Sequence, residues 1–103
     1  METRNIAGKS VSFTEDGYMS DMNEWNEDIA RELAKEENIE LSEQHWKLME
    51  FLRKKHAAGE GLTIRSVGKS GIVDIKGFYG LFPGGPLKLA TKIAGLPKPA
   101  SCV

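Results

Sequence analysis

Apolar residues alternate with polar ones near the start of the chain, a pattern typical of short β-strands. Residues 5–7 and 10–14 form two such runs, and Gly8-Lys9 between them predicts a tight turn that pairs the runs as a hairpin. Asp16-Gly17 signals a second turn, after which Tyr18-Met19 predicts the start of a third short strand. A hairpin of this size needs a helical layer over one face to be stable.

Helical spacing replaces the alternation in the next segment. Trp25, Ile29 and Leu33 lie four residues apart and therefore fall on one face of an α-helix. Asn23 is a suitable N-cap, and Asn38 is a suitable stop. We therefore expect a first helix between these two asparagines.

A second helix is predicted from the N-cap Ser42 to an end signal at residues 57–59. Its apolar residues are Trp46, Met49, Phe51 and Leu52. Its last turns are basic, which suits the negative end of a helix, and hold Arg53, Lys54, Lys55 and His56.

The segment that follows contains several glycines, which weaken its helical signals. Thr63 predicts one capped helical turn. Asp74 predicts the cap of a further helix, whose apolar residues are Ile75, Phe78, Leu81 and Phe82. Residues 83–85, Pro-Gly-Gly, predict a turn.

The last helix is bracketed by Pro86 at its first position and Gly95 just past its end. Its apolar stripe consists of Leu87, Ala90, Ile93 and Ala94. Residues 96–103 contain two prolines, which lack backbone donors and favour an extended path. We therefore expect an arm at this end of the chain.

Composition narrows the class of protein. The chain has 103 residues, of which 40% are hydrophobic and 28% charged, and these values fit one small globular domain. Its mean hydropathy is −0.38, and no apolar run approaches the roughly 18 residues needed to cross a bilayer. With no secretion signal visible, we expect a soluble, cytoplasmic protein without membrane contact. One cysteine and two histidines favour neither a metal site nor a bound cofactor.

Charge is distributed unevenly along the chain. Residues 1–52 hold 5 lysines and arginines against 13 acidic residues, whereas residues 53–103 hold 9 against 2. The two halves either neutralise each other in the fold or leave a basic surface free for an anionic partner. The first interpretation is the simpler one for a small domain.

Cys102 is the strongest candidate for a reactive residue, because it follows the two prolines of the predicted arm. A stiff arm loses little entropy when its thiol docks at another protein. The alternative is an incidental thiol on a frayed tail. Activation as a thiolate requires a nearby cation, for which the candidates in this chain are Arg65, Lys69, Lys76 and Lys92.

The histidines and tryptophans of the chain are better explained by structural roles than by chemical ones. His45 fits a packing or capping role early in the second helix, and His56 fits that helix's dipole. Trp25 and Trp46 fit the core. No phosphate-binding loop or Ser/His/Asp arrangement stands out.

Several motifs together resemble the DsrC/TusE family, whose members are known as the gamma subunit of dissimilatory sulfite reductase or as sulfur-relay proteins. The similarity covers nearly the whole chain, and the run Lys-Ile-Ala-Gly-Leu-Pro-Lys-Pro at residues 92–99 is its most specific part. The other matching residues are Asp16-Gly17-Tyr18, Trp25, His45-Trp46, Phe51-Leu52-Arg53, Ile64-Arg65, Leu81-Phe82-Pro83, Gly85-Pro86 and Cys102-Val103.

The resemblance implies an α+β fold. A small N-terminal antiparallel β-meander (residues 1–20) packs on an orthogonal helical array (residues 23–94). The array contains a helix-turn-helix-like element, and an extended C-terminal arm (residues 95–103) completes a single domain. The segment between Arg65 and Lys76 is shorter here than is usual in the family.

The resemblance also implies chemistry. Cys102 matches the family's persulfide-carrying cysteine. The second arm cysteine of DsrC lies 11 residues upstream, where this chain has Thr91, so intramolecular two-cysteine chemistry is excluded and the pattern is TusE-like.

The leading function is therefore that of a sulfur carrier, a sulfurtransferase-type protein rather than a stand-alone enzyme. It would pass sulfane sulfur between donor and acceptor proteins towards a tRNA-modifying enzyme or in dissimilatory sulfur metabolism. The alternatives are a gamma-subunit partner of dissimilatory sulfite reductase and a regulatory helix-turn-helix-like protein that binds nucleic acid through its basic half.

Overall fold

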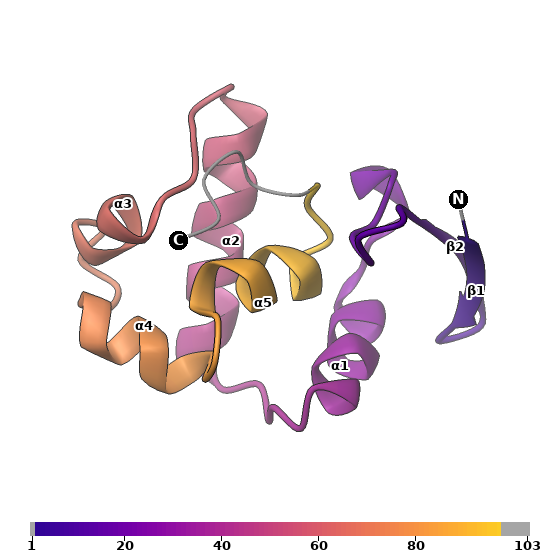
Figure 1. Cartoon of the computed structure of the whole chain (residues 1–103), viewed down its shortest axis with the longest axis horizontal. Coiled ribbons are helices and arrows are strands. Elements are labelled where there is room, and N and C mark those ends of the chain that lie inside the picture. Colours follow the sequence, from indigo (N-terminus) through magenta and orange to yellow (C-terminus); the bar gives the residue numbers. More distant parts are fainter. Residues whose placement is uncertain (1, 98–103) are drawn as a thin grey trace.

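A β-hairpin and five α-helices make up residues 2–97, the part of the chain that this computed structural model describes (Figure 1). The hairpin lies at one end of the molecule, and the short helices α3 and α4 lie at the other (Figure 1). The body measures 35 × 28 × 21 Å along its principal axes. The predicted α+β class is confirmed.

Strands β1 (Glu2–Ile6) and β2 (Lys9–Phe13) pair antiparallel, with Ile6 opposite Lys9. The turn falls on Ala7 and Gly8, one residue before the predicted position, and both have positive φ, of 51° and 81°. Two such residues form the type of turn that matches the twist of a hairpin. The expected third strand is reduced to one isolated antiparallel β-bridge, which pairs Phe13 with Met19.

Helix α1 (Glu27–Glu36) begins three residues later than predicted. Its N-cap is Asn26, whose side chain accepts a hydrogen bond from the Ile29 backbone N–H at 2.9 Å. The prediction that Asn23 caps this helix is therefore wrong, because Asn23 lies inside the 3₁₀ turn η1 (Met22–Glu24). The stop is confirmed at Asn38, which has a φ of 58°.

The predicted caps of the next three helices are confirmed. Ser42 caps α2 (Glu43–Ala57), Thr63 caps α3 (Ile64–Gly68), and Asp74 caps α4 (Ile75–Leu81). In each case the side chain accepts a hydrogen bond from the backbone N–H three residues on, which satisfies a donor that the helix leaves unpaired.

Helix α5 (Pro86–Ile93) lies between the other helices and contacts α1, α2 and α4 (Figure 1). Every residue of its predicted apolar stripe is buried, and the stripe belongs to the single core that also receives the inner face of the hairpin. The end of α5, from which the chain continues towards Cys102, is therefore held by the centre of the fold.

None of the helices in the described part of the chain is long and apolar enough to span a membrane.

Candidate functional site

Cys102 lies outside the described residues, so the site is built from the segment that leads to it. We call this segment, Ile93–Leu96 in the sequence, the arm root. It begins at Ile93, the last residue of α5, and both Ile93 and Leu96 are fully buried. The chain becomes exposed at Pro97.

The arm root ends α5 with a Schellman motif. The Leu96 backbone N–H donates to the Thr91 carbonyl at 2.9 Å, and the Gly95 N–H donates to the Lys92 carbonyl at 3.3 Å. Gly95 has a φ of 72°, which glycine adopts without the penalty a side chain would bring. Leu96 is then directed into the core with 0% of its surface exposed.

Trp25 holds the arm root from the N-terminal side. Its indole Nε1–H donates to the Ile93 carbonyl at 2.8 Å. A Cβ atom on Gly95 would lie 2.4 Å from Trp25 Cδ1, so the backbone passes directly against the ring. Gly95 is therefore required both for its φ and for this close approach.

Arg53 holds the arm root from α2. Its Nη1 donates to the Ala94 carbonyl at 2.7 Å, and its Nη2 donates to the Met22 carbonyl at 3.1 Å. Its guanidinium carbon lies 4.2 Å from the centre of the Trp25 ring. Burial lowers the pKa of Arg53 below its usual range, but an arginine remains charged in proteins. Arg53 thus joins three segments that are distant in sequence.

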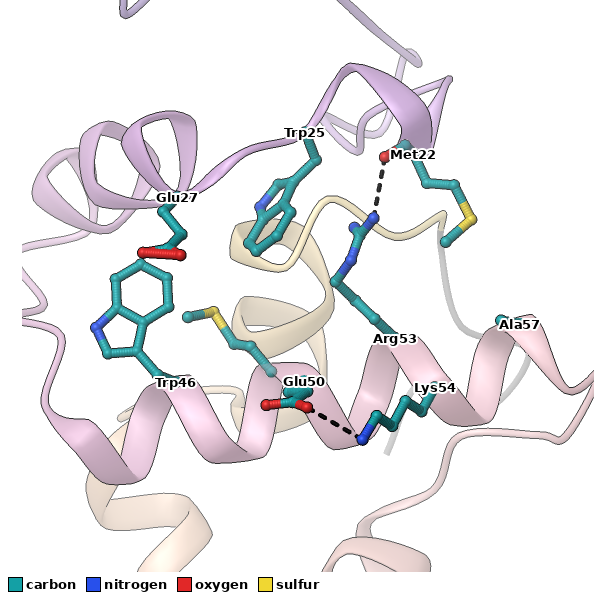
Figure 2. Close-up of a pocket in the computed structure, with 9 residues that line it drawn as sticks. Met22, Trp25, Glu27, Trp46, Glu50, Arg53, Lys54 and Ala57 are labelled. Carbon is teal, nitrogen blue, oxygen red and sulfur yellow. Dashed lines mark hydrogen bonds and ion pairs between the residues drawn. The ribbon is translucent and has the colours of Figure 1, made fainter.

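A groove of about 510 Å³ opens beside these contacts, between η1 and α2. Figure 2 shows the Trp25 and Trp46 rings on its walls and Arg53 reaching across to Met22. Its remaining lining residues are Glu27, Met49, Glu50, Lys54 and Ala57. The arm root therefore lies next to a partly apolar groove.

The expected arm boundary at residue 95 falls inside packed structure. Gly95 and Leu96 are buried, and their hydrogen bonds tie them to α5. Residues 95 and 96 are therefore part of the packed body in the described part of the chain. Residues 98–103, which include Lys98 and Cys102, lie outside the described residues.

The four cations predicted to favour a thiolate separate into two groups. Arg65, Lys69 and Lys76 are exposed. Arg65 lies in α3, Lys69 is the C-cap of α3, and Lys76 lies in the adjoining helix α4. Lys92 lies on α5, and its Nζ is 3.6 Å from a carboxylate oxygen of Glu37. The fold brings the first three to one end of the molecule and directs Lys92 towards the acidic half.

Ion pairs between the two halves of the chain are few within residues 2–97. Lys92 pairs with Glu37 and Lys54 pairs with Glu50, whereas the other ion pairs join residues of the same half. The arrangement therefore favours the second interpretation of the charge pattern, in which a basic surface stays free.

Comparison with known proteins decides the family. Residues 5–103 match the family described as DsrC-like protein. The chain belongs to the DsrC-like family. It is 40% identical to the sulfurtransferase TusE homolog of Haemophilus influenzae, in an alignment covering 96% of this chain and 98% of that protein.

Solved structures agree with this assignment. The solution structure of DsrC from Allochromatium vinosum has a TM-score of 0.80 and 39% identity, covering 99% of this chain and 98% of that one. The oxidized gamma subunit of dissimilatory sulfite reductase from Archaeoglobus fulgidus has a TM-score of 0.81 and 36% identity, covering 99% of this chain and all of that one, 100%. This DsrC-like chain therefore has the family fold over its whole described length.

Thr91, which the sequence resemblance matches to the second cysteine position of DsrC, is fully buried in this DsrC-like protein. Its hydroxyl donates to the Leu87 carbonyl at 2.8 Å and lies 3.1 Å from the Lys88 carbonyl. The hydroxyl is therefore satisfied by carbonyls within α5.

Sequence reasoning missed the roles of Trp25 and Arg53. Arg53 was expected to interact with the negative end of its helix, and Trp25 was expected to lie in the core. Both side chains are instead half-buried and bind the arm root. The available signal was that both belong to the motifs shared with the family. The apolar spacing placed Trp25 on the first helix with Ile29 and Leu33, but Trp25 lies before that helix, at the end of η1. Trp46 is likewise half-buried at the groove rather than fully enclosed.

Proposed function

We propose that this protein is a sulfur carrier that accepts sulfane sulfur as a persulfide on Cys102 and passes it to an acceptor protein. The observation that carries the proposal is membership of the DsrC-like family together with a lone cysteine that follows a firmly anchored arm root. The sulfurtransferase TusE name of its relatives supports the same role.

The chemistry is an exchange at sulfur with no net oxidation. The Cys102 thiolate attacks the outer sulfur of a donor persulfide, the donor's S–S bond breaks, and the donor leaves as a thiolate. The new persulfide on Cys102 then undergoes the same attack by an acceptor thiolate, which regenerates the Cys102 thiolate. Each step forms one S–S bond and breaks one.

The arm root sets how far the sulfur travels. Cys102 follows Leu96 by six positions, and a fully extended chain of that length spans at most about 21 Å. Because Leu96 is fixed, partners must bring their reactive sulfur within this radius of the body. The carrier therefore requires partners that dock closely.

The thiolate needs a positive environment, which we assign to Arg65, Lys69 and Lys76. Lys92 is the weakest of the four candidates, because Glu37 already offsets its charge. Removing two of the three free cations should slow alkylation of Cys102 by iodoacetamide at neutral pH, since only the thiolate reacts. An unchanged alkylation rate in the Arg65→Ala/Lys69→Ala variant would remove this assignment.

The partners are sulfur-donor and sulfur-acceptor proteins. The TusE-like pattern favours a route towards a tRNA-modifying enzyme, whereas the names of structural neighbours point to dissimilatory sulfite reductase. A persulfide carrier needs a reducing compartment that keeps its thiol free, which fits the cytoplasm. Direct binding of nucleic acid is disfavoured, because α3 has five residues and ends at Gly68.

The test is intact-mass analysis after incubation with a persulfidated donor protein. We expect the wild type to gain one sulfur atom and the Cys102→Ser variant to gain none. Addition of an acceptor thiol should then remove the sulfur. If no persulfide donor adds sulfur to Cys102, the carrier function is wrong.

A further inference from the structure

Two large hydrophobic side chains are exposed within residues 2–97, and both lie on α4. Ile75 is 47% exposed and Tyr79 is 48% exposed. They are separated by four positions, so they lie one turn apart on the same face of the helix. An apolar pair of this kind on an otherwise polar surface is typical of a protein contact.

Ile75 also lies against α3. A Cβ atom on Gly68 would be 2.8 Å from Ile75 Cγ1, so the isoleucine side chain covers the bare backbone at the end of α3. Lys69 follows Gly68 directly, and Arg65 precedes it by one turn. Ile75 therefore lies between the cations at the end of α3 and the exposed apolar face of α4.

Lys76 completes the surface, because it follows Ile75 and lies three positions before Tyr79. We call this surface the α3–α4 patch and define it by its five exposed residues, Arg65, Lys69, Ile75, Lys76 and Tyr79.

The cations of the α3–α4 patch are not neutralised by the rest of the described chain. Across residues 2–97 the ion pairs engage other lysines and arginines, and none reaches these three residues. The one carboxylate on the two helices and the loop between them, that of Asp74, caps α4 by accepting a hydrogen bond from Gly77 N–H at 2.6 Å.

We propose that the α3–α4 patch is the docking surface for an acidic protein partner that exchanges sulfur with Cys102. Its apolar centre is flanked by positive charge, so it complements a partner surface with an apolar residue among carboxylates. Such complementarity raises the rate of encounter and orients the partner. That the partner exchanges sulfur with Cys102 rests on the proposed carrier function, whereas the assignment of the α3–α4 patch as a docking surface does not.

A protein fits this patch better than a nucleic acid. Phosphate contacts need cations alone, and an exposed isoleucine adds nothing to them. The five residues of α3 are also too few for a helix lying along a groove. The acidic half of a second copy is the competing protein occupant.

The experiment uses two synthetic donor peptides of equal length, each with one cysteine persulfide and one leucine. Glutamates surround the persulfide in the first peptide, and lysines surround it in the second. The rate of sulfur addition to Cys102 of the full chain is followed by intact mass, with cysteine persulfide as the small donor. At low salt we expect the acidic peptide to react about tenfold faster than the basic one, and the difference to shrink at high salt.

Variants locate the effect. The Lys69→Glu/Lys76→Glu variant should abolish the preference for the acidic peptide, and Tyr79→Ala should weaken it. The matched control, Lys9→Glu/Lys35→Glu, makes the same change in net charge at exposed positions on β2 and α1 and should keep the preference. Each peptide rate is divided by the rate of the same variant with cysteine persulfide, because replacing Lys69 and Lys76 also slows the Cys102 thiolate itself.

The docking proposal is wrong if the two peptides react at equal rates, or if the patch and control variants lose the preference for the acidic peptide equally. It is also wrong if the protein self-associates in a salt-dependent way that Lys69→Glu/Lys76→Glu abolishes. Tighter binding of a labelled RNA duplex than of the acidic peptide would contradict it as well. If no donor adds sulfur to Cys102, the carrier function fails instead. Fluorescence anisotropy with a thiol-free acidic peptide then decides the docking surface separately.

Discussion

The guanidinium of Arg53 lies 4.2 Å from the centre of the Trp25 ring, and the two side chains bind consecutive carbonyls of the arm root. Trp25 binds Ile93 O, and Arg53 binds Ala94 O. Because the two side chains also stack, each orients the other's donor. This pair fixes the point from which the chain continues towards Cys102.

The Trp25→Phe variant removes the indole N–H but keeps an aromatic ring against Gly95 and Arg53. We expect it to lower the free energy of unfolding by about 1 kcal/mol, the typical net value of one hydrogen bond. Urea denaturation measures the change. Trp46→Phe is the control, because Trp46 makes no hydrogen bond through its indole within residues 2–97. Equal losses in both variants would contradict a specific role for the Ile93 contact.

Gly95→Ala combines an unfavourable φ with a steric overlap. Gly84→Ala tests the φ alone, because Gly84 has a φ of +89° and nothing within 4 Å of an added Cβ. We expect Gly84→Ala to cost about 1 kcal/mol. Gly95→Ala should cost about 1–3 kcal/mol more, because its Cβ overlaps the Trp25 ring. Similar midpoints of thermal unfolding for the two variants would show that the Trp25 ring shifts to make room for the Cβ at little cost.

Arg53→Met keeps an unbranched apolar stem but leaves the Ala94 and Met22 carbonyls without their donor. We expect a loss of about 2 kcal/mol or more in unfolding free energy, since hydrogen bonds from charged groups are the stronger kind. Loosening of the arm root should also raise the rate of trypsin cleavage after Lys92. Lys54→Met is the control, because Lys54 is exposed and pairs with Glu50 at the surface. Unchanged cleavage after Lys92 in Arg53→Met would argue against the anchoring role.

His45 links the start of α2 to the end of α4. Its Nδ1 accepts from the Ser42 backbone N–H at 3.0 Å, so Nε2 carries the proton and donates to Leu81 O at 2.8 Å. We expect His45→Phe to keep the edge-to-face contact with Phe82 and to lose about 1–3 kcal/mol of stability through the two unpaired backbone groups.

His56→Phe provides the comparison for this prediction. His56 lies in the last turn of α2 and is half-buried, so the same substitution there tests the cost of exchanging histidine for phenylalanine without the two bonds. A loss in His56→Phe as large as that in His45→Phe would mean that the bridge between α2 and α4 contributes nothing measurable.

Local signals predicted most helix boundaries correctly. Ser42, Thr63 and Asp74 act as caps because each bond closes within three residues and needs no other segment. The same rule gave a wrong cap for α1, since Asn23 and Asn26 are equally suitable by type. The choice between them depends on η1, which the apolar spacing does not reveal.

The site shows the limit of such signals more clearly. His45 was expected to pack or cap, and the capping is confirmed, because its partner Ser42 is three residues away. Its second partner, Leu81, is 36 residues away and could not be named. The free cations on α3 and α4 could be listed as candidates, but only the fold separates them from Lys92.

The sequence alone determined the order of most strands and helices and the family, because these follow from spacing, caps and motifs read along one segment at a time, and it proposed Cys102 as the reactive residue. Tertiary structure decided how the arm root is held against the body. The hydrogen bonds from Trp25 and Arg53 to the arm root span 68 and 41 residues. Contacts at such separations form only when the core brings the helices together, so no local pattern records them.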